Sequence, residues 1–311
     1  MTIDVVIPLY RPKEEFVTLI RLLKKQTLSI NRIILVNTEK ALYDEFAGRV
    51  SFDASEYGAE VYHIGVKEFD HAGTRHMAMQ KSDADVVVMM TQDAVPADEK
   101  LLEHLTAHLT EGVAVAYARQ LPRKNAGVIE QVTREFNYPG ESQLRDASDI
   151  NRLGIKAFFC SDVCAAYRRE LYMKVGGFKA PAIFNEDMIF AHDALIKGHK
   201  VAYAADAEVF HSHNYSGMQQ LRRNFDLGVS QADHPKVFEG IKSESEGKRL
   251  VKYALKRFNR LRRPWLVVPF GIQCVFKLLG YRLGKNYMKL PSGLVRKLTG
   301  NKAYWDINVK K

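Results

Sequence analysis

The chain is poor in cysteine, and the spacing of its cysteines predicts neither disulfides nor a zinc site. Only three occur among 311 residues. Cys160 and Cys164 are four residues apart, without a second cysteine pair or a histidine at zinc-ligand spacing. We therefore expect buried thiols in a protein of a reducing compartment.

Signal-peptide features, internal repeats and low-complexity segments are also missing. The first ten residues, MTIDVVIPLY, show no basic region followed by a long apolar stretch. We therefore expect a cytoplasmic protein. A length of 311 residues allows one large domain or two small ones.

Acidic residues are nearly absent from the C-terminal part. Residues 248–311 contain 17 of the 46 Lys and Arg but one of the 36 Asp and Glu, which is Asp306. Their net charge is +16, whereas residues 1–247 carry −6. Because the two parts of the chain carry net charges of opposite sign, we expect them to have different binding partners, and the C-terminal part is expected to bind an anionic partner.

The pattern of the tail favours a membrane surface as that partner. Residues 250–263 form a basic amphipathic helix pattern, and residues 265–276 are almost free of charge but interrupted by Pro269 and Gly271. Twelve apolar residues are too few to cross a bilayer, for which about 20 are needed. A helix lying in the membrane interface fits better. Four further residues could meet anionic headgroups: Lys277, Arg282, Lys285 and Lys289.

The tail could instead form a helical dimer interface or a lid packed on the rest of the chain. Charge alone would also allow nucleic acid as its partner. Aromatic residues interleaved with Leu and Pro favour lipid over nucleic acid.

Strand and helix patterns alternate in the first half. Strands are expected at residues 3–9, 32–36, 60–64, 86–90 and 113–118, and helices at 14–26, 43–50, 73–80 and 98–109. This order predicts an α/β protein whose mostly parallel sheet has helices on both faces.

The second half is less regular. Residues 120–157 are polar and predict a long irregular segment, which in a compact domain is more often functional than inert. After it we expect a strand and turn at 157–168, helices at 170–175 and 187–197, and short strands at 201–204 and 208–210.

The clearest functional signal is Asp93, which follows the apolar run 86–90. A Val-rich run without charged residues predicts a strand buried on both faces. Open α/β sheets bind ligands just past the carboxyl ends of such strands. Asp93 therefore predicts metal or phosphate binding. The alternative is a cap for the next helix, although Asp98 is better placed for that.

Three other segments carry polar residues at similar positions. Residues 6–11, VIPLYR, end a strand, and residues 69–75, FDHAGTR, start a helix whose N–H groups could face a phosphate. Asn185-Glu186-Asp187 also begins a helix, and a later strand leads into His211-Ser212-His213.

Taken in order, these motifs resemble the family 2 glycosyltransferases of the GT-A fold, and within them the rhamnan-type cell-wall rhamnosyltransferases of Gram-positive bacteria. The resemblance spans about residues 3–228 and rests on FDHAGTRH, TQDA, NEDMIFAHDA and HSHNYSGMQQLRRNFDLG. It implies a Rossmann-like GT-A catalytic domain at residues 1–240. A basic amphipathic helical extension at 241–311 follows it.

The resemblance implies roles for the carboxylates and histidines. Asp187 matches the general base and Glu186 would orient the acceptor, although both could simply cap a helix. Asp93 matches the last residue of a metal-binding DxD motif, with Thr91 or Gln92 in place of its first carboxylate. His211, and secondarily His213, would complete a Mg²⁺ or Mn²⁺ site through the substrate phosphates.

A donor-binding set also follows from the resemblance: Pro8, Tyr10, Arg11, Asn37, Asp70, Gly73, Arg75, Gln92, Arg222 and Arg223. Arg75 would fork onto a phosphate or stack on a base, and a salt bridge to Asp70 is the ordinary alternative. Asn37 replaces the base-binding Asp of many members, which puts the base in doubt. The QxxRW-like element containing Arg222 and Arg223 lacks its Trp.

The expected function is inverting transfer of L-rhamnose from dTDP-β-L-rhamnose to a polyprenyl-diphosphate-linked glycan in cell-wall polysaccharide synthesis. The enzyme would lie peripherally on the inner face of the cell membrane, without nucleic acid, and could form a homo-oligomer. Alternatives are another donor, such as UDP-GlcNAc or UDP-galactose, or a noncatalytic protein that binds nucleotide sugars or polyanions.

Overall fold

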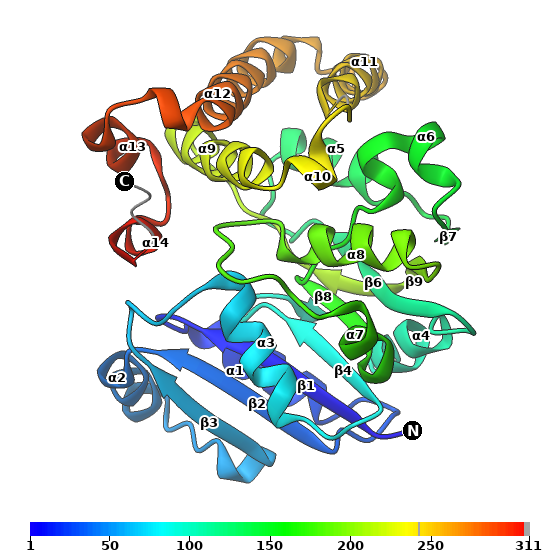
Figure 1. Ribbon diagram of the computed structural model, residues 1–311, viewed down its shortest axis with the longest axis vertical. Helices are drawn as coiled ribbons and strands as arrows, with labels where there is room; N and C mark the ends of the chain where they lie inside the picture. The colour runs from blue at the N-terminus through cyan, green and yellow to red at the C-terminus, as the bar shows by residue number, and fades with distance from the viewer. Residues whose placement is uncertain (242, 308–311) are drawn as a thin grey trace. The chain divides into compact units, whose positions relative to one another are not determined.

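The computed structural model describes residues 1–241 and 243–307, which form two compact units (Figure 1). The first comprises Met1–Leu121, Tyr138–Pro181 and Glu186–His211. The second comprises Pro122–Asn137, Ala182–Asn185 and the described part of Ser212–Lys311. The expected division near residue 240 stays a prediction about where the catalytic function ends.

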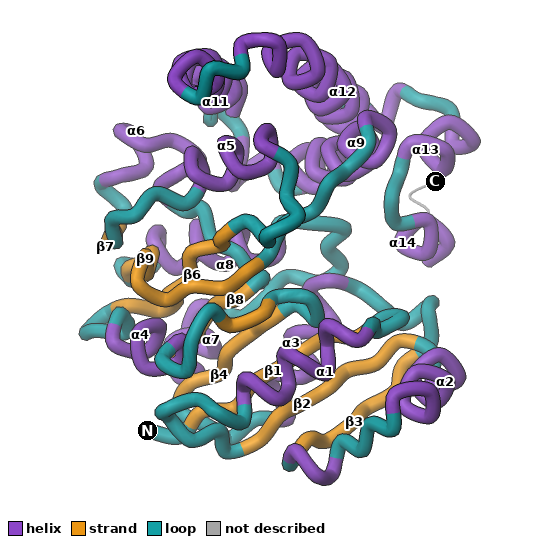
Figure 2. The backbone as a smooth tube through the Cα atoms, turned by 180° about the vertical axis from the view of Figure 1, so that it is seen from behind, coloured by secondary structure: helices purple, strands orange, loops and turns teal. Residues whose placement is uncertain are grey.

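A single mixed sheet organises the first unit (Figure 2). The described strands are β1 (Ile3–Leu9), β2 (Arg32–Thr38), β3 (Ala59–Ile64), β4 (Val86–Met90), β5 (Val95–Pro96), β6 (Val113–Leu121), β7 (Gln143–Arg145), β8 (Cys164–Arg168) and β9 (Lys200–Phe210). Their order is β3-β2-β1-β4-β8-β6-β9-β5, and β7 pairs with β9. The pairs among β3, β2, β1 and β4 are parallel, whereas β8 runs antiparallel to both β4 and β6. The predicted α/β fold with a mostly parallel sheet is confirmed.

Helices cover both faces of this sheet. They are α1 (Glu14–Leu23), α2 (Lys40–Val50), α3 (His71–Lys81), α4 (Leu101–Ala107), α6 (Asp149–Leu153), α7 (Arg169–Val175) and α8 (Glu186–Ile196), with short 3₁₀ turns at Ser55–Tyr57 and Gly154–Ala157. The apolar sides of α1, α2 and α4 share one core with alternate residues of β1 and β4. Figures 1 and 2 show α3 on the opposite face.

Three expectations about this unit and its neighbourhood were wrong. The segment 120–157 is not irregular, because it contains α5 (Val128–Asn137), β7 and α6. The two short strands expected at 201–204 and 208–210 are one strand, β9, with a register shift opposite Ala118 and Arg119. Helix α4 begins at Leu101 rather than 98, and Asp98 instead accepts the backbone N–H of Lys100 at 2.8 Å.

The second unit is helical in its described residues. Besides α5 it contains α9 (Gly217–Asp233), α10 (Pro235–Phe238), α11 (Ser243–Arg260), α12 (Val267–Lys285), α13 (Ser292–Leu298) and α14 (Lys302–Ile307), with 3₁₀ turns at Pro264–Leu266 and Tyr287–Lys289. Helices α9 and α12 touch backbone to backbone. A Cβ on Gly280 would lie 2.1 Å from the Leu221 carbonyl oxygen, and one on Gly284 would lie 2.1 Å from that of Phe225. Only glycine permits this approach.

The expected interruption of the tail at Pro269 and Gly271 was also wrong. Pro269 occupies the third position of α12, where a backbone N–H has no helical partner in any case. The helix therefore continues through both residues. By length and composition alone, Pro264–Lys285 is long and apolar enough to cross a membrane.

Candidate active site

Asp93 and His211 meet at one edge of the sheet because of strand pairing. β5 begins two residues after Asp93, β9 ends one residue before His211, and Val95 pairs with Phe210. The two side chains consequently face each other, with His211 Nε2 3.6 Å from Asp93 Oδ2.

Gln120, near the end of β6, fixes the tautomer of this histidine. Its Oε1 lies 2.9 Å from His211 Nδ1, so Nδ1 donates and the lone pair belongs to Nε2, the atom nearest Asp93. The Gln120 amide also donates to Ser161 Oγ at 2.9 Å. A hydrogen-bonded partner that fixes the ring in this way is typical of metal-binding histidines.

The Asp93–His211 pair fits a divalent cation. A separation of 3.6 Å is too long for a good hydrogen bond. However, two ligand atoms each about 2.1 Å from one ion are about 3–3.6 Å apart. His213 follows two residues later, in the second unit, and its part in the metal site stays a prediction. A carboxylate with imidazole is a donor set that Mn²⁺ or Mg²⁺ can share with phosphate oxygens.

A cluster of three carboxylates surrounds a single guanidinium in the same unit. Arg75, on α3, is 5% exposed. Its Nε lies 3.4 Å from Asp162 Oδ2, and its Nη1 lies 3.2 Å from Glu186 Oε1. The third carboxylate belongs to Asp187, whose Oδ2 accepts the Asp162 backbone N–H at 3.1 Å. We call Arg75, Asp162, Glu186 and Asp187 the carboxylate cluster.

The cluster lies beside the Asp93 turn. Met90 pairs with Cys164, so the segment before β8 runs alongside the end of β4. The Thr91 N–H accordingly donates to the Val163 carbonyl oxygen at 3.1 Å. Asp162, one residue earlier, is thereby tied to the turn that carries Asp93.

Burial makes the carboxyl groups of Asp162 and Asp187 hold protons unusually strongly. It raises the pKa of Asp162 to about 7, although Arg75 and a 2.6 Å hydrogen bond from the Tyr167 hydroxyl lower it in part. Burial, and then the neighbouring Glu186 and Asp162, raises the pKa of Asp187 well above its usual range. Perturbed carboxyl groups of this kind are typical of catalytic acids and bases.

Asp70 and Arg75 do not form the salt bridge that was the ordinary alternative for them. The Asp70 carboxylate caps α3 by accepting the Gly73 N–H at 2.5 Å. The ion pairs described for Arg75 go to Asp162 and Glu186 instead. Phosphate contacts of Asp70, Gly73 and Arg75 stay predictions.

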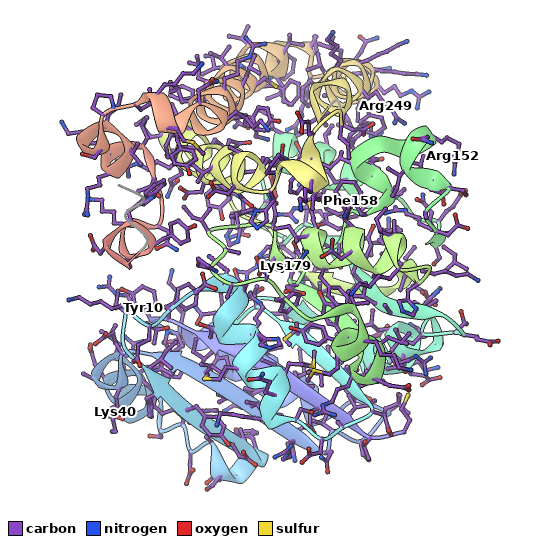
Figure 3. The ribbon with its side chains drawn as sticks, viewed as in Figure 1. Tyr10, Lys40, Arg152, Phe158, Lys179 and Arg249 are labelled. Carbon is purple, nitrogen blue, oxygen red and sulfur yellow. The ribbon has the colours of Figure 1, made fainter. Side chains whose placement is uncertain are left out.

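The predicted donor residues of β1 and β4 are joined by a side chain. The Tyr10 N–H donates to Gln92 Oε1 at 3.0 Å, and Gln92 Nε2 donates to the Tyr10 carbonyl oxygen at 2.9 Å. Tyr10 is exposed past the carboxyl end of β1 (Figure 3), and Arg11 follows with a positive φ of 49°. Pro8 lies half-buried within β1. Gln92 therefore fixes the backbone of the Tyr10 loop.

Asn37 lies beside the Tyr10 loop, because it pairs with Leu9 at the end of β1, whereas Arg222 and Arg223 belong to the second unit. Asn37 is fully buried near the end of β2, with Nδ2 3.1 Å from His63 Nδ1. Its Oδ1 has no hydrogen-bond partner among the described residues. Arg222 and Arg223 are exposed on α9 in the second unit, where the Arg223 guanidinium lies 4.6 Å from the Phe184 ring centroid.

Sequence reasoning did not single out Asp162 or Gln120. The signal that could have found Asp162 was its position just before the apolar strand Cys164–Arg168. An antiparallel strand begins at the edge where its parallel neighbours end, so a carboxylate before β8 reaches the same edge as Asp93. Gln120 lies two residues past the strand expected at 113–118, but its neutral amide did not suggest a site.

Sequence relatives were found over most of the chain. The family model for glycosyl transferase family 2 matches residues 4–176. The O-antigen chain rhamnosyltransferase RfbN of Salmonella typhimurium is 34% identical over 312 residues, which cover 98% of this chain and 96% of that protein. The O-antigen chain rhamnosyltransferase WbaN of Salmonella anatum is 37% identical over 259 residues, 81% of each chain.

Solved structures show a similar fold. The mannosyltransferase PcManGT from Pyrobaculum calidifontis, in complex with GDP-Man and Mn²⁺, superposes with a TM-score of 0.54 at 14% identity, covering 99% of this chain and 88% of that one. S. aureus TarS 1–349 in complex with UDP-GlcNAc gives 0.52 at 13% identity, covering 93% and 92%. These likenesses show the GT-A fold alone.

Proposed function

Because the chain belongs to glycosyl transferase family 2, we propose that this glycosyltransferase moves L-rhamnose from dTDP-β-L-rhamnose to a polyprenyl-diphosphate-linked glycan. The sugar is supported by the two rhamnosyltransferase relatives, one of them alignable over nearly the whole chain. The chemistry is supported above all by the carboxylate cluster, tied to the turn that carries Asp93.

Asp93, His211 and His213 would hold Mg²⁺ or Mn²⁺. The ion, when bound, supplies positive charge to the leaving nucleoside diphosphate. Gln120 keeps the Nε2 lone pair of His211 on the side of Asp93. The Mn²⁺ in the PcManGT complex adds support from the same fold.

Asp187 would act as the general base. It takes the proton of the acceptor hydroxyl while that oxygen attacks the anomeric carbon and the bond to the diphosphate breaks, with its electrons leaving on the diphosphate. Attack opposite the leaving group inverts the β-linked donor into an α-L-rhamnoside. The raised pKa of Asp187 makes its carboxylate a stronger base than an ordinary aspartate. Glu186, held by Arg75, would orient the acceptor.

Asn37 is fully buried near the end of β2, so it does not distinguish the possible donor bases. UDP-GlcNAc and UDP-galactose are therefore the competing donors.

The deciding experiment measures transfer from a panel of nucleotide sugars to a lipid-linked acceptor. We expect turnover with dTDP-β-L-rhamnose and little with UDP-GlcNAc, UDP-galactose or GDP-mannose. Preferential use of a UDP-sugar would overturn the choice of donor while leaving the enzyme class intact.

The base is tested with Asp187→Asn, which keeps the size of the side chain but cannot accept the proton. We expect turnover to fall by about 10²–10⁴ with donor affinity nearly unchanged. Asp193→Asn, on the same helix and half-buried beside Lys179, serves as the matched control. Near-normal turnover of Asp187→Asn would show that Asp187 only caps α8.

The cation is tested by adding EDTA. Transfer should stop and return with Mn²⁺ or Mg²⁺, and Asp93→Ala should abolish it without altering the thermal unfolding midpoint. Full activity in EDTA would remove the metal from the mechanism.

A further inference from the structure

One side of α12 is apolar and open to solvent. Val268, Ile272, Val275 and Leu279 recur every three or four residues and are 68%, 53%, 55% and 49% exposed. Trp265, just before the helix, is 65% exposed. We call these five side chains the α12 stripe. The spacing places the four helical members on one face.

Two other sides of α12 pack within the second unit. Gly280 and Gly284 touch the backbone of α9, so the helix cannot rotate. Phe270 packs edge-to-face on Phe258 of α11, with ring centroids 5.5 Å apart. Lys277 is half-buried on the side of α12 opposite Leu279, and its burial lowers its pKa. The α12 stripe is therefore held facing outward.

Basic side chains accompany the stripe on the preceding helix and turn. Exposed examples are Lys252, Lys256, Arg260, Arg262 and Arg263. The single acidic residue of 248–311, Asp306, is paired with Arg296. This part of the second unit thus combines exposed apolar surface with uncompensated positive charge.

We propose that this face docks on an anionic lipid surface, with the α12 stripe in the headgroup region and the basic residues of α11 on the phosphates. A second copy of the chain is the less suitable occupant, because it would bring another strongly positive face against this one. Apolar burial together with basic flanks is the usual pattern of helices that lie in a membrane interface.

Docking, rather than crossing, follows from the packing of α12. Its length and composition would allow it to span a membrane. However, its glycine face lies against α9, a helix with many polar residues, and Lys277 and Arg282 lie within it. The inference stands apart from the proposed rhamnosyl transfer, since it needs neither the donor nor the acceptor.

The apolar part is tested by vesicle flotation. The full chain should float with phosphatidylglycerol–phosphatidylcholine vesicles and much less with phosphatidylcholine alone. Ile272→Asp should weaken flotation by about tenfold or more, because a charge replaces an inserted apolar group. Ile196→Asp is the matched control, since Ile196 is 62% exposed at the end of α8 in the other unit.

The charged part is tested with Lys252, Lys256 and Arg260 changed together to Gln. Each basic residue near an anionic surface is worth about fivefold in partition, so the triple variant should bind about 100-fold more weakly. The control changes Arg21, Lys24 and Lys25, exposed at the end of α1, to Gln. A blue shift of Trp265 emission on adding anionic vesicles, absent in Trp265→Phe, should accompany binding.

Several results would overturn the proposal. The full chain could ignore anionic vesicles, or the stripe and charge variants could float as well as their controls. A concentration-dependent dimer that Ile272→Asp disrupts, with no vesicle binding, would assign the face to a second copy. Resistance of the bound protein to alkaline carbonate extraction would indicate a spanning helix instead.

Discussion

Asp162 should tune the general base although it need not touch substrate, and Asp162→Asn tests this. Asp162 is 3% exposed, and its backbone N–H donates to Asp187 Oδ2 at 3.1 Å. Its carboxylate is one of the causes that raise the pKa of Asp187. Replacing it with an amide keeps the backbone bond and removes the charge. The pKa of Asp187 should therefore fall.

The size of the shift follows from simple electrostatics. Two unit charges about 6 Å apart interact by about 3 kcal/mol at an effective dielectric constant of about 20. One pKa unit corresponds to about 1.4 kcal/mol. Asp162 carries only part of a charge at pH 7, since its pKa is about 7, and Asp187 is partly exposed to water. We therefore expect the pKa of Asp187 to fall by about one unit.

The assay is the pH dependence of kcat/KM for transfer, whose acid limb reports the base in the free enzyme. That limb should move about one unit lower, and the plateau should fall about threefold because the base is weaker. Asp83→Asn, at the exposed opposite end of β4, should leave the profile unchanged. An acid limb that stays in place or moves upward would refute the electrostatic coupling.

Stability gives a second readout with a definite sign. The pKa of Asp162 in the folded protein, about 7, lies above the ordinary aspartate value of 3.8. Its protonated form therefore favours folding at low pH, and this contribution is lost as pH rises through about 7. Relative to the parent, Asp162→Asn should gain stability between about pH 4 and pH 7 in denaturant titrations. A constant difference across that range would contradict the raised pKa.

Two further substitutions address packing and donor binding. Gly280→Ala should lower the free energy of unfolding by about 2 kcal/mol or more, because its Cβ would lie 2.1 Å from the Leu221 carbonyl oxygen. Gly271→Ala, with nothing within 4 Å of its Cβ, should be neutral or stabilising, and equal effects would refute the tight contact. Gln92→Ala should raise KM for the donor about tenfold with a smaller change in kcat, because it frees the Tyr10 backbone. Gln26→Ala, whose amide bonds backbone groups elsewhere, is the control, and an unchanged KM would show that the Tyr10 loop is not part of the donor site.

The elements that could be predicted are those with an unambiguous local pattern. The runs 3–9 and 86–90 have charge-free interiors or nearly so, and they fold as strands buried on both faces. Helix α5 was missed although Val128, Ile129, Val132 and Phe136 recur at helical spacing, because the surrounding segment 120–157 is polar and predicts one loop. Val132 is buried in a small core with Phe258 of α11. The continuity of α12 through Pro269 was missed because a proline is tolerated only in the first turn of a helix, and the sequence did not show that α12 begins at Val267.

The residues of the candidate site also fall into two groups, those predictable from a local pattern and those that depend on distant parts of the chain. Residues at strand and helix ends, such as Asp93 and Glu186, could be selected because topology directs those ends to one edge. The side chains that contact these residues could not be identified from the sequence. Arg75 fits a phosphate-binding pattern at the start of α3, yet its guanidinium faces Asp162, which lies 87 positions later in the sequence.

The ion pairs of Arg75 with Asp162 and Glu186 have a physical consequence for the reaction. A single buried guanidinium between Asp162 and Glu186 holds both carboxylates in place without cancelling the charge around Asp187. Removing Arg75 would leave two buried carboxylates unpaired, which is strongly destabilising. The same arginine therefore keeps the cluster folded and leaves enough uncompensated negative charge to make Asp187 basic. A phosphate-binding arginine at this position would achieve neither, so the cluster accounts for the buried Arg75 more fully than the donor site does.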